Sequence, residues 1–118
     1  MLSATELGAM RAAVEASLPD MCEVQRVTLA AGSYGEQTES WKSIATVACR
    51  VAPAGGLPQE RVMAERLGNV STWTVTLPAL TDVRVGDRLL VGTRTFAVAG
   101  VLARSEEIAR RVVCSEAV

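Results

Sequence analysis

The stretch from residue 72 to residue 102 limits the possible folds of this chain more than any other part of the sequence. TWTVTLP at 72–78 alternates apolar and polar residues and ends at Pro78. DVRVGDRLLVGTRTFAVAGV at 82–101 contains two further apolar runs, divided by a Gly-Asp-Arg turn and a Gly-Thr-Arg turn. A period of two places successive side chains on opposite faces of a strand, and glycines at this spacing mark tight turns. The pattern predicts short antiparallel strands joined as a β-meander.

Glycine and aspartate residues give this meander its expected detail. Gly86 and Asp87 are predicted to form a structural turn, with a positive φ at Gly86 and the Asp87 side chain bound to the turn backbone. Gly100 is expected to permit a bulge in the strand at 95–102. Asp82 and Asp87 also have the residue type of an acid–base pair or a calcium site, but turn formation accounts for them better. The residues expected to face inward are Trp73, Val75, Leu77, Phe96, Val98 and Leu102.

The first half of the chain predicts two longer strands and a connecting loop. Residues 21–29 and 38–51 keep the period of two, and AAGSYGEQ at 30–37 has the two glycines of a hairpin loop. The second strand is long enough to predict a bend or bulge near Ser43. A last strand at 110–117 follows the polar loop SEEIA. One face of the second strand is expected to carry Trp41, Ala45, Val47, Cys49 and Val51.

A helix is predicted before the first strand. SATE at 3–6 has the form of a capping box, in which the Ser3 side chain accepts from the backbone N–H of Glu6. Apolar residues then recur at helical spacing until Pro19 ends the helix. This apolar stripe consists of Leu7, Met10, Val14 and Leu18. It is expected to pack against the body of the same domain, and docking on a partner is the alternative.

The longest predicted loop, at about 52–69, lies between the second and third strands. APAGGLP at 52–58 breaks regular structure, and QERVMAERLGN at 59–69 is compatible with one or two helical turns or with an extended loop. Its length makes it the first candidate for a functional segment. The 118 residues thus predict one mainly β domain, with a helix at 1–19 and a small antiparallel barrel or sandwich of five or six strands at 20–118.

Composition narrows the possible activities. The chain has no histidine, Lys42 and Tyr34 are the sole lysine and tyrosine, and aromatic residues make up 3%. Without the commonest general base, and without the aromatic walls typical of ligand pockets, we expect no enzymatic activity, no bound cofactor and no metal site. Cys22, Cys49 and Cys114 are expected to be reduced core residues, since they form no Cys-x-x-Cys pair.

Charge and hydropathy exclude two further classes of protein. The net charge is −1, the predicted pI is near 5.5 and the cations are dispersed, so the sequence lacks the basic patch of a nucleic-acid-binding domain. No run approaches the roughly 20 apolar residues that span a bilayer. The N-terminus also lacks the charged and apolar regions of a secretory signal. We therefore expect no membrane association and assembly in the cytoplasm.

The order of the segments is informative in itself. A CEVQRV strand, a glycine-containing loop before ESW, a loop-rich insertion and TWTVTLP are followed by VGDRLLVGTRTFAVAGV and a closing strand with Cys114. This order resembles the small head–tail joining proteins of long-tailed double-stranded DNA phages, a family variously called head-closure, head-completion, stopper or adaptor proteins. The resemblance covers most of residues 21–117, and its best element is GDR at 86–88 followed by RTF at 94–96.

The resemblance implies a structural, non-enzymatic protein of the virion neck, assembled in the host cytoplasm. Family members are β-barrels that form a ring, expected here to be dodecameric, between the portal or adaptor ring and the tail proteins. Their long loop points into the central channel and helps retain packaged DNA. In this chain the loop would carry Glu60, Arg61, Glu65 and Arg66, whose charges balance and let double-stranded DNA pass without specific binding. The alternatives are a tail-completion or tail-terminator protein, or a cellular β-barrel interaction module.

Contacts between neighbouring copies are expected at two places. A head-to-tail ring uses two different surfaces of each copy, and unpaired strands readily join other strands. The first candidate is the hairpin tip, which consists of Gly32, Ser33, Tyr34 and Gly35. The second is the last strand, where Arg111 lies.

Overall fold

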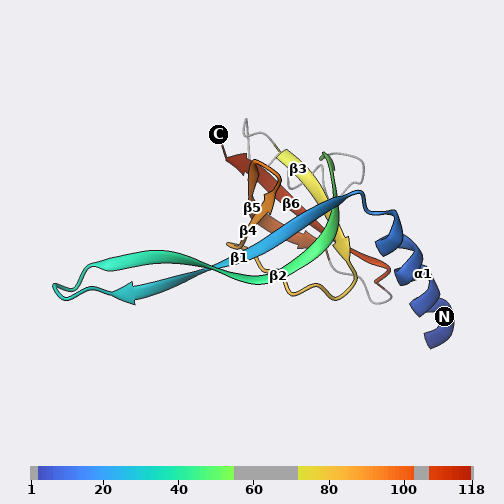
Figure 1. The fold of residues 1–118 in the computed structure, drawn as a ribbon, viewed down its shortest axis with the longest axis horizontal. Coiled ribbons are helices and arrows are strands. Elements are labelled where there is room, and N and C mark those ends of the chain that lie inside the picture. Colours follow the sequence, from blue (N-terminus) through green and yellow to red (C-terminus); the bar gives the residue numbers. More distant parts are fainter. Residues whose placement is uncertain (1–2, 55–71, 103–106, 118) are drawn as a thin grey trace.

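The protein is a closed antiparallel β-barrel with a helix on its outside and a long two-stranded projection (Figure 1). The computed structural model describes residues 3–54, 72–102 and 107–117. The strand order around the barrel is β1-β2-β3-β6-β5-β4, and β4 pairs with β1 to close it. The elements are α1 (Ala4–Ser17), β1 (Asp20–Ala31), β2 (Gln37–Pro53), β3 (Thr72–Pro78), β4 (Arg88–Val91), β5 (Arg94–Leu102) and β6 (Ala109–Ala117). The predicted mainly β fold of five or six antiparallel strands with an N-terminal helix is confirmed.

The barrel interior is filled mainly by small apolar side chains, as the scarcity of aromatic residues requires. Phe96 is the largest fully buried side chain, and Trp73 packs against it edge to face with ring centroids 6.5 Å apart. The alternation in β3 and β5 produces this interior, because every second residue faces the barrel axis. Other residues with no exposed surface include Cys22, Val24, Cys49, Val75, Leu77, Leu89, Val112 and Cys114.

Two bulges bend the strands, close to the positions that the sequence predicts. Between β1 and β2 the register shifts at Val24 and Gln25, which pair with Ala45 and Ser43, so β2 has one extra residue beside Ser43. Between β5 and β6 it shifts between Val98 and Gly100. An extra residue reverses the alternation that follows it.

The second bulge explains why one residue that was predicted to face inward does not. Leu102 was expected to face inward together with Phe96 and Val98, but Val101 packs against the core instead. The physical reason is the extra residue at Ala99, which shifts every later side chain of β5 to the opposite face.

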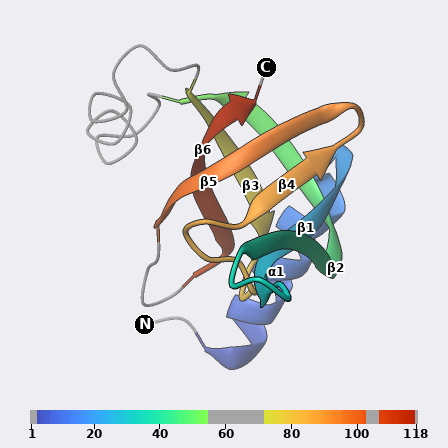
Figure 2. The same cartoon turned by 90° about the vertical axis from the view of Figure 1, so that its left-hand side faces the viewer.

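Helix α1 lies against β3 and β6 on one side of the barrel (Figure 2). The Ser3 side chain accepts from the backbone N–H of Glu6 at 3.1 Å, which is the predicted cap, and Leu18 follows the last helical residue. Among the described residues of α1, none is fully buried, and Met10 keeps 39% of its surface exposed. The predicted apolar stripe is therefore half covered by the barrel. In the described part of the chain, no helix is long and apolar enough to cross a membrane.

The strands around the first hairpin are longer than predicted. β1 runs to Ala31 because Ala30 and Ala31 pair with Thr38 and Gln37, so the connecting loop is 32–36 instead of 30–37. β2 runs to Pro53, inside the region predicted to be a loop from residue 52. Most of that predicted loop lies outside the described residues.

Candidate functional site

The most prominent surface of the molecule is the distal part of the β1–β2 hairpin, residues 27–41, here called the arm. Pairing with β4 covers only residues 23–25 of β1, and pairing with β3 begins at Arg50 of β2, as far as the described residues show. The arm therefore extends beyond the barrel as a two-stranded ribbon (Figure 1), and the molecule measures 55 × 31 × 26 Å. An isolated hairpin of this kind is marginally stable in water. A partner is the usual reason for such a ribbon to exist.

The tip of the arm presents a tyrosine to solvent. The tip contains the four residues predicted as contacts, Gly32, Ser33, Tyr34 and Gly35. Gly35 has a φ of 83°, and its N–H donates to the Gly32 carbonyl at 3.1 Å, which closes the turn. Tyr34 keeps 94% of its surface exposed.

The two faces of the arm differ in chemistry. Residues paired across antiparallel strands share a face, so the pairing of Val27 with Trp41 and of Leu29 with Glu39 places Val27, Leu29 and Trp41 together. Leu29 is 59% exposed. The opposite face has Thr28 and Ser40, whose hydroxyl oxygens are 3.0 Å apart. One face therefore carries the apolar side chains of Val27, Leu29 and Trp41, and the other is polar and built from small residues.

An ion pair fixes the root of the arm to the barrel. The Arg26 guanidinium donates to both carboxylate oxygens of Asp87, at 3.1 and 2.9 Å, and to Asp82 at 3.2 Å. The Asp87 side chain is 4% exposed and also accepts from the backbone N–H of Arg84 at 2.9 Å. These hydrogen bonds raise the pKa of Arg26, Asp87 being the larger cause, and the pKa of Asp82 is lowered by its hydrogen bond with Arg26. The two aspartates thus both bind the Arg26 guanidinium.

A second contact holds the arm from the other strand. The Arg88 guanidinium lies over the Trp41 ring at 4.3 Å from its centroid, and Arg88 Nε donates to Gln25 Oε1 at 2.6 Å. Trp41 belongs to β2, whereas Arg26 belongs to β1, so each strand of the arm has its own connection to the β4 region. The direction in which the arm leaves the barrel is therefore fixed by two independent contacts.

The loop that receives Arg26, residues 79–87 between β3 and β4, is held at both ends. At its start, Glu107 accepts from the backbone N–H of Leu80 at 3.0 Å and from Arg110 Nε at 2.9 Å, and its side chain is 4% exposed. At its end, Gly86 has a φ of 95° and its N–H donates to the Val98 carbonyl at 3.1 Å. The loop is consequently a rigid platform for the arm root.

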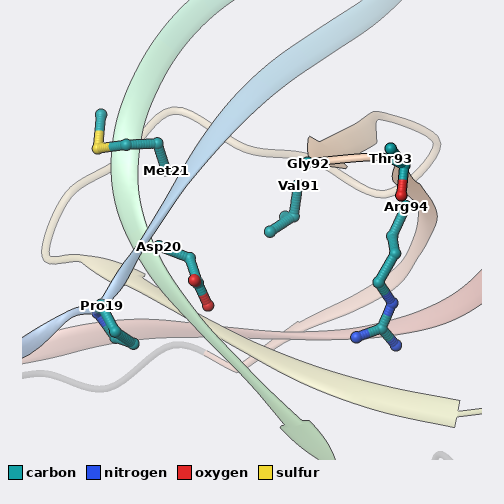
Figure 3. Close-up of a pocket in the computed structure, with 7 residues that line it drawn as sticks. All are labelled: Pro19, Asp20, Met21, Val91, Gly92, Thr93 and Arg94. Carbon is teal, nitrogen blue, oxygen red and sulfur yellow. The ribbon is translucent and has the colours of Figure 1, made fainter.

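A shallow groove lies at the end of β1 opposite the arm. Its volume is about 570 Å³, and it separates the start of β1 from the β4–β5 turn (Figure 3). Met21 is 60% exposed beside it, and Arg94 extends along it from the other side. Arg94 is held in place by Glu116, to which its Nε donates at 2.7 Å. The remaining lining residues are Pro19, Asp20, Val91, Gly92 and Thr93.

The three cysteines meet in the barrel interior. All three are free and have no exposed surface. A hydrogen bond with Cys49, followed by burial, raises the pKa of the Cys22 thiol, and burial raises the pKa of Cys114 to about 12. Among the described residues, no group of three or more Cys, Asp or Glu side chains is arranged to hold a metal ion. The thiols serve as small apolar side chains of the core.

The structure separates the residues that the sequence singled out. The four tip residues lie at the end of the arm, whereas Arg111 lies on the barrel surface in β6 (Figure 1). Glu60, Arg61, Glu65 and Arg66 lie outside the described residues. Sequence reasoning missed Arg26 and the Glu107–Arg110 pair. One signal was available for Arg26, because it continues the inward-facing alternation of Cys22 and Val24, where a cation needs a buried partner.

Comparison with known protein families identifies the class of this chain. A family model described as phage head completion protein matches residues 15–116, which include the whole barrel and the arm. The chain therefore belongs to the phage head completion protein family, whose members are structural proteins of the virion. A search among curated proteins found no significant match.

Solved structures share the fold at low sequence identity. Protein SF1141 from Shigella flexneri 2a has a TM-score of 0.66 and 19% identity, covering 84% of this chain and 92% of that one. A chain of the native gene transfer agent virion has a TM-score of 0.53 and 19% identity, with the same coverage. Protein xkdH of the phage-like element PBSX from Bacillus subtilis has a TM-score of 0.50 and 16% identity, covering 82% of this chain and 92% of that one. Two of the three come from a virion or a phage-like element.

Proposed function

We propose that copies of this chain form a ring in the neck of a phage or phage-like particle, between the portal or adaptor ring of the head and the tail proteins. The supporting observation is the family match over residues 15–116 together with an arm that has no partner strand among the described residues. A head completion protein has to bind other virion proteins, and the arm is the surface most clearly built for it. The protein acts as a structural part without catalysis.

The arm is proposed to contact the neighbouring copy in this ring. It projects over a distance comparable with the 26–31 Å width of the molecule, so it reaches a barrel packed alongside. The contact is head-to-tail, because a protruding ribbon on one copy meets a different surface on the next. Such contacts close into rings when the rotation between copies is a whole fraction of a turn. Twelve copies are proposed, to match the symmetry that the family resemblance implies.

The segment at 52–69 is proposed to line the DNA channel of this ring. Most of it follows β2 in the sequence, and it carries both signs of charge at Glu60, Arg61, Glu65 and Arg66. Balanced charges avoid the strong phosphate contacts through which basic surfaces hold DNA. Double-stranded DNA would then pass during ejection without specific binding, which is consistent with the net charge of −1.

The test is complementation in vitro. Heads filled with DNA are prepared from a deletion of the gene, incubated with the purified protein and then mixed with tails. We expect the protein to bind the heads, to protect their DNA from nuclease and to restore joined particles in negative-stain images. A variant with residues 28–40 replaced by Asn-Gly, which keeps the barrel pairs, should fold but should not restore joining. Binding to isolated tails instead of heads would contradict the proposal and favour a tail-completion role.

A further inference from the structure

We propose that Tyr34 at the arm tip of one copy inserts into the groove between the start of β1 and the β4–β5 turn of the next copy. This inference rests on the proposed ring and names the two surfaces that meet in it. It assigns the donor surface to residues 32–36 and the acceptor surface to the groove that contains Met21, Val91 and Arg94.

Tyr34 has the properties of an anchor residue. It is 94% exposed at the end of a rigidly rooted ribbon, and the residues on either side of it are the small Ser33 and Gly35. Tyrosine is enriched among residues that carry the binding energy of interfaces, because it buries a large ring and keeps a polar end. Full exposure of such a ring in the isolated chain is a cost that a partner surface removes.

The groove has the matching chemistry (Figure 3). Val91 provides an apolar wall, whereas the exposed Met21 side chain lies at the edge of the groove and points away from Val91 and Arg94. The Arg94 guanidinium already lies over the Trp73 and Phe96 rings at 4.4 and 4.8 Å, and its side chain is 39% exposed, so a further ring can approach it. The Asp20 carboxylate can accept a hydrogen bond from the tyrosine hydroxyl.

The positions of tip and groove favour a second copy as the partner. They lie at opposite ends of the same strand, β1, which runs from Asp20 beside the groove to Ala31 beside the tip. Ten residues from Met21 to Ala31 span about 33 Å. Copies joined tip to groove would therefore be displaced along β1, and each copy would present one tip and one groove, as a head-to-tail ring requires.

Two defective variants test the contact directly. Tyr34→Ala lacks the tip but keeps the groove, and Asp20→Arg fills the groove but keeps the tip. In sedimentation velocity over micromolar to millimolar concentrations, the wild type should self-associate, and each variant alone should associate at least tenfold more weakly. An equimolar mixture of the two variants has one intact contact for each pair of molecules. It should form heterodimers and stop there. Met10 is exposed and lies outside the contact, so Met10→Glu is a matched control that should behave as the wild type.

A cysteine cross-link gives a second measurement. Because the native thiols are buried, a mixture of Tyr34→Cys and Thr93→Cys proteins should form disulfide-linked heterodimers under mild oxidation. Self-association of Tyr34→Ala at wild-type strength overturns the inference, as does a variant mixture that stays monomeric. A wild type that neither associates nor cross-links also overturns it. Rings that form and join heads to tails without Tyr34 would reject this contact while leaving the proposed function intact.

Discussion

The arm and one part of the barrel belong to the same β1–β2 hairpin, yet their side chains differ in burial. In the barrel part of β1, Cys22 and Val24 have no exposed surface, whereas Leu29 and Tyr34 in the arm region are 59% and 94% exposed. β1 continues through both with the same alternation, and its register with β2 shifts by one residue between Val24 and Gln25. The two parts differ in the burial of their side chains: the barrel interior buries those of the first part, whereas those of the arm are exposed to solvent. The difference teaches that one strand can be buried at one end and exposed to solvent at the other.

Two contacts connect the two regions at their junction. Arg26 and Trp41, one on each strand, bind Asp87 and Arg88, which are neighbours at the start of β4. A flexible arm would lose more conformational entropy on binding a partner than a preoriented one. The two root contacts therefore lower the cost of assembly in advance.

The largest expected effect distinguishes the barrel from the arm by truncating one side chain in each. Phe96→Ala removes the largest fully buried side chain of the barrel and should lower the free energy of unfolding by about 3–5 kcal/mol. Leu29→Ala removes an exposed side chain of the arm and should change it by less than about 0.5 kcal/mol. Urea unfolding followed by circular dichroism measures both. Similar losses in the two variants would mean that the arm is part of the cooperative fold.

The next effect concerns the junction. Asp87→Asn leaves Arg26 with the exposed Asp82 as its remaining carboxylate partner, and it should cost about 2–3 kcal/mol because the lost partner is 4% exposed. The matched control is Arg84→Gln. Arg84 is 71% exposed and 3.8 Å from Asp82, so its loss should cost less than about 0.5 kcal/mol. Thermal unfolding of both variants decides the point, and equal shifts would refute a special role for the Arg26–Asp87 pair.

A third effect tests the turn that carries Asp87. Gly86 has a φ of 95°, which a β-branched residue adopts at considerable strain, so Gly86→Val should cost about 1–3 kcal/mol. Gly8 in the middle of α1 has open space around it, and Gly8→Ala should stabilise the protein by about 0.5–1 kcal/mol. Because the two substitutions are expected to change the free energy of unfolding in opposite directions, any measure of stability can distinguish them. An unchanged melting temperature for Gly86→Val would contradict the strain.

Local sequence patterns predicted the elements well, for identifiable reasons. The capping box at Ser3 and the alternation in TWTVTLP depend on neighbours within four residues, and both appear as expected. The bulges beside Ser43 and Gly100 were also predicted from local features, namely the length of the second strand and the glycine at position 100. Leu102 was misplaced because a single extra residue at Ala99 changes the face of everything after it, and no local pattern fixes the position of such a residue to one place.

The arm and its root were beyond local reasoning. Arg26 and Asp87 are separated by 61 positions in the sequence, so only the closed barrel brings them together. The period of two at 21–29 correctly predicted a strand, and the structure gives that strand an apolar face at Val27 and Leu29. It could not reveal whether that face is covered by the same chain or by another, because the period of the pattern is the same in both cases. The residues of an assembly surface therefore look like core residues in the sequence.

The smallest expected effect concerns the cysteine thiols, all of which lie in the barrel. Burial raises the pKa of Cys114 from 9.0 to about 12, so the folded protein keeps a proton that the unfolded chain releases above pH 9. This contribution to stability is complete below pH 9 and is lost as the pH rises toward 12, by about 1.4 kcal/mol per pH unit. The stability of Cys114→Ala should fall less steeply with pH, by one proton, over pH 9–10.5 in urea titrations. The slope of the free energy of unfolding against pH reports the titration of the Cys114 thiol, because the packing lost in the variant does not depend on pH.

The same thiols distinguish the two regions by their reactivity. In the folded protein at pH 8, the buried native cysteines should react with a thiol reagent only as fast as the barrel opens, whereas a cysteine placed at the tip by Ser33→Cys should react at once. Reaction of Cys114 at the rate of the tip thiol, or equal pH slopes with and without Cys114, would show that the barrel interior admits solvent. The contrast between a closed barrel and an exposed arm would then not hold, because it depends on a barrel interior from which solvent is excluded.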